Sequence, residues 1–203
     1  MALCRFVRVL HDSGFMGVLH MDAPKNGLTI ALVGPESSGK STLCCALAET
    51  FKTHFVAEYA RTYFEKQRPE HYTPELIYKL MNQQLELETQ ASQKAKILFC
   101  DTSAVSFAVW SKIRFGYVWP SIEARLKEHF NTFTLVLSPD LPWVNDGIRE
   151  NPLDLKRIFN THINFLQALA LPYGIVNGTG PERMQSALAQ LQNYGPVANA
   201  LKL

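Results

Sequence analysis

The sequence predicts an α/β protein with a parallel five-stranded sheet, and two observations carry this prediction. Apolar segments of buried-strand length alternate along the chain with segments of helical periodicity, which is the pattern that a parallel sheet requires. A glycine-rich loop also separates the first of these strands from the helix that follows it. Strand, glycine loop and helix in this order favour a three-layer fold with helices on both faces of the sheet.

The strands and helices can be placed in turn. Five strands are expected, at 28–33, 54–58, 97–100, 133–137 and 173–176. Leu43, Leu47 and Phe51 recur every four positions, as expected of an amphipathic helix after the glycine loop. Thr73 and Pro74 are a typical cap and first helical residue, and they predict a long helix. From there on, helices are expected at 74–94, 103–114, 118–130, 152–170 and 181–193.

Length and composition are those of one ordinary globular domain. The chain has 203 residues, of which 47% are hydrophobic and 19% are charged, so it can bury a substantial core. Its net charge of +2 gives no indication of a nucleic-acid or membrane partner. The four cysteines have no metal-ligand spacing, and we expect packed, reduced thiols and a cytoplasmic location.

We interpret residues 27–203 as one domain, because no internal repeat, low-complexity tract or long linker interrupts them. Residues 1–26 are interpreted as an N-terminal extension. The apolar run in this segment is too short and too interrupted for a transmembrane span or a signal peptide. Met21 stands just before the turn-rich lead into the first strand, and our hypothesis is that it is the functional start.

The segment Gly34–Thr42 matches the phosphate-binding pattern G-x-x-x-x-G-K-[ST] of a P-loop. Its glycines let backbone N–H groups turn around an anion, and the helix N-terminus adds further donors. Lys40 is expected to reach the β- and γ-phosphates of ATP, and Ser41 to bind Mg²⁺. The predicted fold class is therefore a P-loop NTPase. The predicted nucleotide contacts are Gly34, Glu36, Ser37, Ser38, Gly39, Lys40, Ser41 and Thr42.

Asp101 ends the buried strand expected at 97–100 and is the second candidate catalytic residue. In P-loop proteins an acidic residue at the end of a neighbouring strand holds Mg²⁺ opposite the loop. Asp101 could also act as a general base, accepting the proton of a hydroxyl group to which the phosphoryl group of ATP is transferred. The alternative is that Asp101 only caps the helix that begins near Ser103.

Glu58, Tyr59 and Arg61 follow the second strand, at the edge of the sheet where open α/β proteins bind substrates. A carboxylate, a phenol and a guanidinium at this edge could hold a polar, ring-bearing acceptor. The alternative is a solvated helix face with no role in binding.

The segment 143–152 follows the fourth strand and contains Trp143, Asp146 and Arg149 between turn-forming residues. An arginine-bearing lid that closes over phosphates would have this composition. Arg149 would then stabilise charge on the transferred phosphoryl group. A plain surface loop would look the same.

These segments together resemble the ribosylnicotinamide kinase domain of NadR-type proteins. The resemblance rests on GPESSGKSTL, on the E-Y-x-R-x-Y run that begins at Glu58, on Asp101-Thr102, and on the P-W-V-x-D-G-x-R run that ends at Arg149. It implies a P-loop kinase fold with a lid and ATP-dependent phosphorylation of the 5′-hydroxyl of nicotinamide riboside. The residues implied in acceptor binding are Glu58, Tyr59, Arg61, Trp143 and Asp146.

Two departures from the family pattern concern the acceptor. Asp101-Thr102-Ser103 stands where the family reads Asp-Thr-Asp, and Ala57 replaces an aromatic residue that the family places before the E-Y run. Two other functions therefore remain as alternatives. One is a kinase for another nucleoside, and the other is a nucleotide-binding regulator or ATPase without a small-molecule acceptor.

Overall fold

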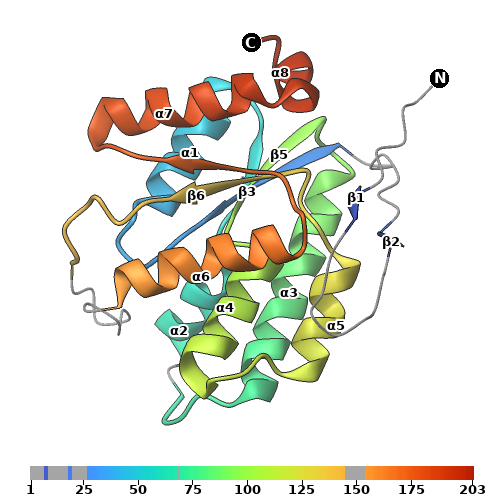
Figure 1. Cartoon of the computed structure of the whole chain (residues 1–203), viewed down its shortest axis with the longest axis vertical. Coiled ribbons are helices and arrows are strands. Elements are labelled where there is room, and N and C mark those ends of the chain that lie inside the picture. The colour runs from blue at the N-terminus through green and yellow to red at the C-terminus, as the bar shows by residue number, and fades with distance from the viewer. Residues whose placement is uncertain (1–6, 9–17, 20–26, 68, 145–153) are drawn as a thin grey trace.

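The computed structural model describes residues 7–8, 18–19, 27–67, 69–144 and 154–203 (Figure 1). Five strands form one parallel sheet in the order β4-β5-β3-β6-β7, which confirms the predicted class. β1 (Val7–Arg8) and β2 (Val18–Leu19) form a separate antiparallel pair. The strands of the main sheet are β3 (Leu28–Val33), β4 (His54–Val56), β5 (Ile97–Asp101), β6 (Phe133–Leu137) and β7 (Tyr173–Val176).

Helices cover both faces of the sheet, as the three-layer prediction requires. α1, α7 and α8 lie on one face, and α2 to α6 lie on the other (Figure 1). The helices span α1 (Lys40–Thr50), α2 (Tyr59–Lys66), α3 (Pro74–Ser92), α4 (Ala104–Phe115), α5 (Pro120–Glu128), α6 (Leu155–Ala168), α7 (Gly180–Asn193) and α8 (Gly195–Leu201).

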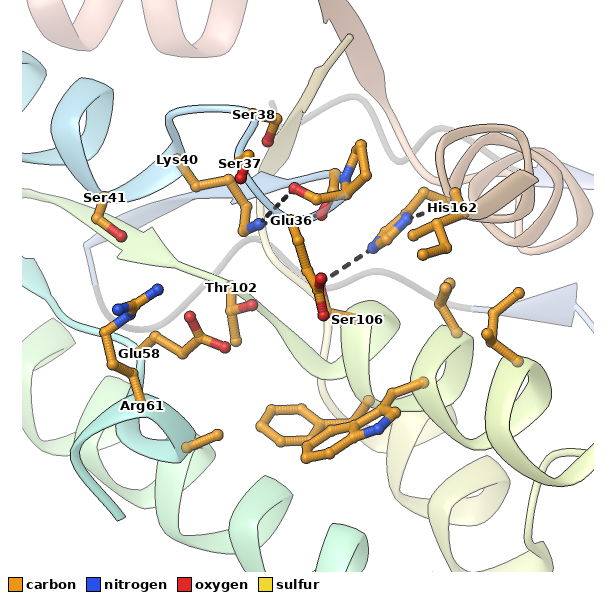
Figure 2. A pocket seen from close by; sticks show the side chains of 18 of the residues that line it. Glu36, Ser37, Ser38, Lys40, Ser41, Glu58, Arg61, Thr102, Ser106 and His162 are labelled. Carbon is orange, nitrogen blue, oxygen red and sulfur yellow. Dashed lines mark hydrogen bonds between the residues drawn. The ribbon is translucent and has the colours of Figure 1, made fainter. Parts of the chain in front are cut away.

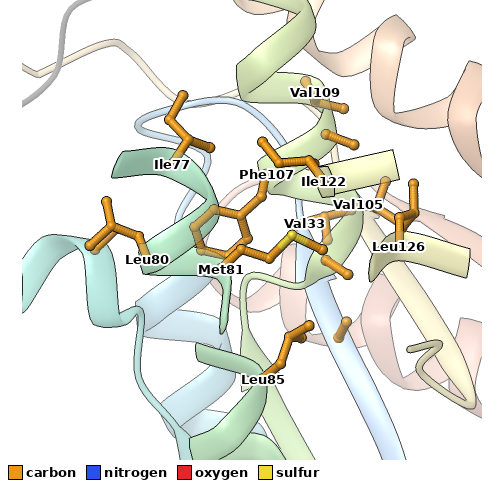
Figure 3. Packing of buried hydrophobic residues seen from close by; sticks show 14 of the residues in the cluster. Val33, Ile77, Leu80, Met81, Leu85, Val105, Phe107, Val109, Ile122 and Leu126 are labelled. Carbon is orange, nitrogen blue, oxygen red and sulfur yellow. The ribbon is translucent and has the colours of Figure 1, made fainter. Parts of the chain in front are cut away.

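The central strand β3 contributes to both cores because successive side chains of a strand point to opposite faces. Ile30 and Leu32 pack with α1 and α7, whereas Ala31 and Val33 pack with α3, α4 and α6. On the second face, Met81 of α3 and Phe107 of α4 lie together in the middle of the layer (Figure 3). Residues 30–33 are buried, so both faces of the strand are covered at the end that leads into the glycine loop.

The predicted elements differ from the structure in three places. The strand predicted at 54–58 ends at Val56, because Glu58 is the residue that precedes the first turn of α2. α2 was not predicted, since it is only eight residues long and half of its side chains are polar or charged. α8 was not predicted either, because Gly195 and Pro196 suggest a turn rather than a helix start.

The interpretation of residues 1–26 as an extension, with Met21 as the start, stays a prediction, because most of this segment lies outside the described residues. Cys44, Cys45 and Cys100 are free thiols, as predicted for these three positions. None of the helices that the structure describes is long and apolar enough to cross a bilayer.

Candidate nucleotide and acceptor site

The carboxyl ends of the parallel strands meet at one edge of the sheet, and the predicted site residues gather there. β3 runs into Gly34, β4 leads to Glu58, and β5 ends at Asp101. β5 lies between β3 and β4, so these three strand ends are neighbours. The topology therefore brings the P-loop and the two predicted carboxylates to one place.

The two motif glycines of the P-loop are required by its backbone. Gly34 has a φ of 140°, and a Cβ built on it would lie 2.6 Å from the carbonyl oxygen of Leu137 on β6. Gly39 has a φ of 79° and precedes the first turn of α1. Both values are in a region that side chains with a Cβ rarely adopt. The loop consequently folds tightly against β6 and points the N-terminus of α1 toward the cavity.

Lys40 lies across the mouth of the loop. Its Nζ donates hydrogen bonds to the carbonyl oxygens of Gly34, at 3.1 Å, and Pro35, at 2.9 Å. The charge is thus held above the loop rather than out in solvent (Figure 2). This is where a lysine must be to meet the terminal phosphates of a nucleotide.

Asp101 is 2% exposed, and burial raises the pKa of its carboxyl above the ordinary value. The charge of Lys40, a hydrogen bond from Ser41 and the charge of Arg61 act in the opposite direction and lower that pKa. Its Oδ1 atom is buried with no hydrogen-bond partner among the described residues. A buried carboxylate oxygen beside the P-loop serine suits a cation better than a helix cap, and no side-chain cap is found on α4.

Glu58 and Arg61 both line the cavity, opposite Lys40 (Figure 2). Burial raises the pKa of the Glu58 carboxyl. The positive charges of Lys40 and Arg61 lower that pKa, whereas the neighbouring Asp101 and Glu36 raise it further. A carboxyl whose pKa is shifted upward beside two cations is a typical feature of a functional site.

The cavity has a volume of about 430 Å³ and extends from the P-loop to an aromatic end. The size is in the range of small-molecule sites. This end is formed by Phe64 of α2, Trp110 of α4, and Tyr72 in the loop before α3. The three rings pack edge to face, with centroids 5.4–5.9 Å apart. The sequence did not indicate this aromatic end, because single aromatic residues in separate segments of the chain look like core residues.

Ser106 of α4 and His162 of α6 also line the cavity (Figure 2). Nε2 of His162 lies 3.3 Å from Oγ of Ser106, and Nδ1 lies 2.9 Å from the carbonyl oxygen of Ile158. Burial lowers the pKa of His162 to about 4. This pair was not found from sequence, since its members are 56 positions apart and belong to no motif.

Arg183 of α7 is a further residue that the sequence did not indicate. It is 4% exposed and lies behind the P-loop. Its Nε donates to the carbonyl oxygen of Gly178 at 2.7 Å, and Nη2 donates to that of Ser138 at 3.2 Å. Asp140 lies 3.5 Å from the same guanidinium. Burial lowers the pKa of Arg183, and Asp140 partly offsets this.

Two of the remaining predicted acceptor residues, Tyr59 and Trp143, are not in the cavity wall. Tyr59 packs against Tyr63 in the core, and its backbone N–H donates to Gln84 at 2.8 Å. It follows Glu58 by one position on α2, so it points to another side of the helix. Trp143 lies over the P-loop, with its Nε1 3.5 Å from a carboxylate oxygen of Glu36. Asp146 and Arg149 lie outside the described residues.

The fold and the loop together define a P-loop nucleotide-binding domain. A family model described as an AAA domain matches residues 29–183, and the chain belongs to this family. Over 147 residues it is 29% identical to the trifunctional NAD biosynthesis/regulator protein NadR of Salmonella typhimurium, and to the same protein of Escherichia coli. This alignment covers 68% of the chain and 35% of each relative. The chain thus spans about a third of the length of these relatives.

Solved structures show the same fold. A crystal structure of NadR protein in complex with NR aligns with a TM-score of 0.68 at 21% identity, over 83% of this chain and 51% of that one. Thymidylate kinase from Ehrlichia chaffeensis aligns with a TM-score of 0.58 at 12% identity, over 81% of this chain and 98% of that one. The chain therefore has the fold of P-loop kinases, as predicted.

Proposed function

We propose that the chain is an ATP-dependent kinase that phosphorylates the 5′-hydroxyl of nicotinamide riboside. One observation carries this proposal. A single cavity joins the P-loop to an aromatic end, and Glu58 and Arg61 line it between the two. A phosphate donor and a ring-bearing acceptor therefore have room side by side. A nucleotide-binding regulator needs no such second compartment. The similarity to NadR in sequence supports the choice of acceptor.

In the proposed reaction the acceptor's oxygen attacks the γ-phosphorus of ATP in line. The bond from that phosphorus to the β–γ bridging oxygen breaks, and ADP leaves. Lys40 neutralises charge on the phosphates from the mouth of the loop. Such transfers depend on positioning and charge more than on covalent participation of the protein.

Glu58 is the carboxyl that can take the proton of the attacking hydroxyl, because it lines the cavity and Asp101 does not. Its raised pKa brings it closer to neutral pH, where a general base works best. Arg61 lies beside it and can donate hydrogen bonds to the ribose hydroxyls. The first role predicted for Asp101, a ligand of Mg²⁺, suits its unpartnered Oδ1 better than the role of base.

Mg²⁺ fits the donors present. Ser41 and Asp101 offer a hydroxyl and a buried carboxylate oxygen, which are hard oxygen ligands of the kind this cation prefers. Mg²⁺ bound with the nucleotide would neutralise negative charge on its β- and γ-phosphates. Among the residues that the structure describes, no group of three acidic, histidine or cysteine side chains forms a complete metal site. The phosphates of ATP must then complete the coordination.

A direct product assay tests the proposal. Purified protein is incubated with ATP, Mg²⁺ and one nucleoside, and the phosphorylated product is identified by mass. Nicotinamide riboside should be converted to its mononucleotide at ordinary kinase rates, on the order of 1–100 per second. Uridine, cytidine and thymidine are tested in parallel, with the Lys40→Ala variant as the inactive control. Preference for another nucleoside would replace the acceptor, and ADP release that no nucleoside accelerates would favour a regulator.

A kinase for another nucleoside stays the second candidate. Ala57 is exposed and offers no ring at the position where the family has an aromatic residue. Phe64, Tyr72 and Trp110, which lie later in the chain than Ala57, form the aromatic end instead. We therefore propose that the nicotinamide ring contacts this aromatic end rather than the E-Y segment. Cation–π attraction between the positively charged ring and an aromatic side chain is worth roughly 0.5–2 kcal/mol.

A further inference from the structure

The hydrogen-bond direction in the His162 pair follows from its partners. Nδ1 of His162 lies 2.9 Å from the carbonyl oxygen of Ile158, which can only accept. The Nδ1 atom must therefore carry the hydrogen. His162 is 2% exposed, and burial and the charge of Lys40 lower its pKa to about 4, so the ring is neutral near neutral pH. Nε2 is then a bare acceptor.

Ser106 completes this chain of donors. Its Oγ lies 3.3 Å from Nε2 of His162, so the hydroxyl hydrogen is directed to the imidazole. A serine hydroxyl has one hydrogen and two lone pairs. With its hydrogen used on His162, Ser106 can offer the cavity only lone pairs. The relay from Ile158 through His162 thus makes Ser106 an acceptor-only group (Figure 2).

Ser106 is close to the aromatic end of the cavity. Trp110 follows it by one turn of α4, and both line the cavity, so the acceptor-only group lies next to the aromatic end. Among the described residues, the cations that line the cavity are Lys40 and Arg61. Lys40 belongs to the P-loop, and Arg61 projects from α2, across the cavity from the Ser106–His162 pair (Figure 2).

We propose that Ser106, oriented by His162, accepts a hydrogen bond from the substituent on the ring of the acceptor, so that the site selects a carboxamide and rejects a carboxylate. The inference rests on the proposed function and deepens it. A carboxamide N–H₂ can donate to the Ser106 oxygen. A carboxylate at the same place meets lone pairs and loses its hydration without gaining a hydrogen bond from Ser106, which is costly. Sites whose polar groups match one ligand discriminate in this way.

The experiment compares kcat/KM of the wild-type protein for nicotinamide riboside and for nicotinic acid riboside, which differ only in this group. We expect roughly 10- to 100-fold preference for the amide. In Ser106→Ala the amide should lose its partner, so the preference should fall to about threefold or less. Ser106→Thr keeps the hydroxyl and should restore the preference.

His162→Gln tests the orienting role separately. A glutamine amide can donate to the Ser106 oxygen, which frees the serine hydrogen to point into the cavity and donate to a carboxylate ligand. The ratio of the two kcat/KM values should therefore fall in this variant too. A loss of folding or of general activity lowers both values alike and leaves their ratio unchanged, so the ratio separates the two causes.

The outcomes distinguish this inference from the proposed function. Equal kcat/KM for the two ribosides in the wild-type protein, or a preference that Ser106→Ala leaves intact, would overturn the inference while the kinase activity stands. Turnover of neither riboside, with another nucleoside phosphorylated in the same assay, would remove the proposed acceptor and the inference with it.

Discussion

The guanidinium of Arg183 donates a hydrogen bond through Nη1 to the carbonyl oxygen of Ser38 in the P-loop, 145 positions earlier in the chain. The same side chain binds the carbonyl oxygens of Ser138, after β6, and Gly178, after β7. One buried cation therefore ties three loops together behind the phosphate site. It therefore fixes the position of a P-loop carbonyl oxygen next to the phosphate site.

The first prediction concerns this clamp. Arg183→Lys keeps a positive charge but has no planar fork that reaches three carbonyl oxygens. We expect KM for ATP to rise about tenfold, since each lost hydrogen bond to a charged group is worth roughly 1.5–3 kcal/mol and only part of that reaches the loop. Steady-state kinetics with varied ATP measures it. Arg157→Lys changes an exposed arginine paired with Asp154 and is the control. Equal KM values for both variants would contradict the clamp.

The second prediction concerns Gln84, which is fully buried on α3. Its Oε1 accepts the N–H of Tyr59 in the first turn of α2, and its Nε2 donates to Glu88 at 3.1 Å. This bond fixes the start of the helix that carries Glu58 and Arg61. Gln84→Leu should raise KM for the acceptor several-fold and leave KM for ATP nearly unchanged, because only the acceptor side loosens.

The matched control is Gln90→Leu, on the same helix. Gln90 is exposed and bonds only to Glu86 one turn away, at 3.2 Å, in the described contacts. This variant should behave as wild type. If Gln84→Leu raises both KM values equally, the effect is a general loss of stability and Gln84 does not position the acceptor site.

Sequence reasoning succeeded where the signal is local. The order strand, loop and helix around Gly34 placed the P-loop, and apolar runs placed all five strands of the main sheet. Asp101 and Glu58 were placed at one edge of the sheet because they stand at the carboxyl ends of parallel strands, and their roles stay predictions. These predictions needed only the periodicity of the apolar residues and the direction in which each strand runs.

Sequence reasoning failed where the signal is tertiary. His162, Arg183 and the pair Ser106 and Trp110 lie on three different helices and belong to no sequence motif. Each looks like an ordinary core or surface residue until helix packing brings it to the cavity or the P-loop. Tyr59 is the opposite case, because its place in a motif suggested a ligand contact while the turn of α2 directs it into the core.

The third prediction concerns Lys40. Its Nζ binds only loop carbonyl oxygens among the described contacts, and the side chain is half-buried, so removing it leaves the core untouched. Lys40→Ala should abolish turnover, because the charge that meets the β- and γ-phosphates is lost. Its melting temperature should stay within a few degrees of wild type. Near-normal kinase activity in this variant would contradict the assignment of the P-loop as the site that binds the reacting phosphates.

The fourth prediction concerns Arg149, which lies outside the described residues. If it stabilises charge on the transferred phosphoryl group, its contact is strongest in the transition state. Arg149→Ala should then lower kcat at least about tenfold while the Kd for ATP changes little. Single-turnover rates and nucleotide titration measure the two separately. A weaker Kd with kcat unchanged would make Arg149 an ordinary nucleotide-binding residue.

The fifth prediction concerns pH and stability. The folded protein holds His162 neutral, with its pKa lowered from 6.5 to about 4 by burial, whereas the unfolded chain protonates it below its ordinary pKa. Between these two values the unfolded state binds the extra proton, so the free energy of unfolding falls as pH falls. The stabilisation is present above about pH 6.5 and is lost progressively toward pH 4. From pH 7 to pH 5 the loss should be about 2 kcal/mol.

Urea denaturation at pH 7 and pH 5 measures this, with His162→Gln as the comparison. All other titrating groups are shared, so the difference in unfolding free energy between wild type and variant isolates His162. That difference should shrink by about 2 kcal/mol on going to pH 5. His54→Gln, which changes an exposed histidine, is measured in the same way as the control. A difference independent of pH would mean that folding leaves the pKa of His162 unchanged, which would contradict the burial of a neutral ring at this position.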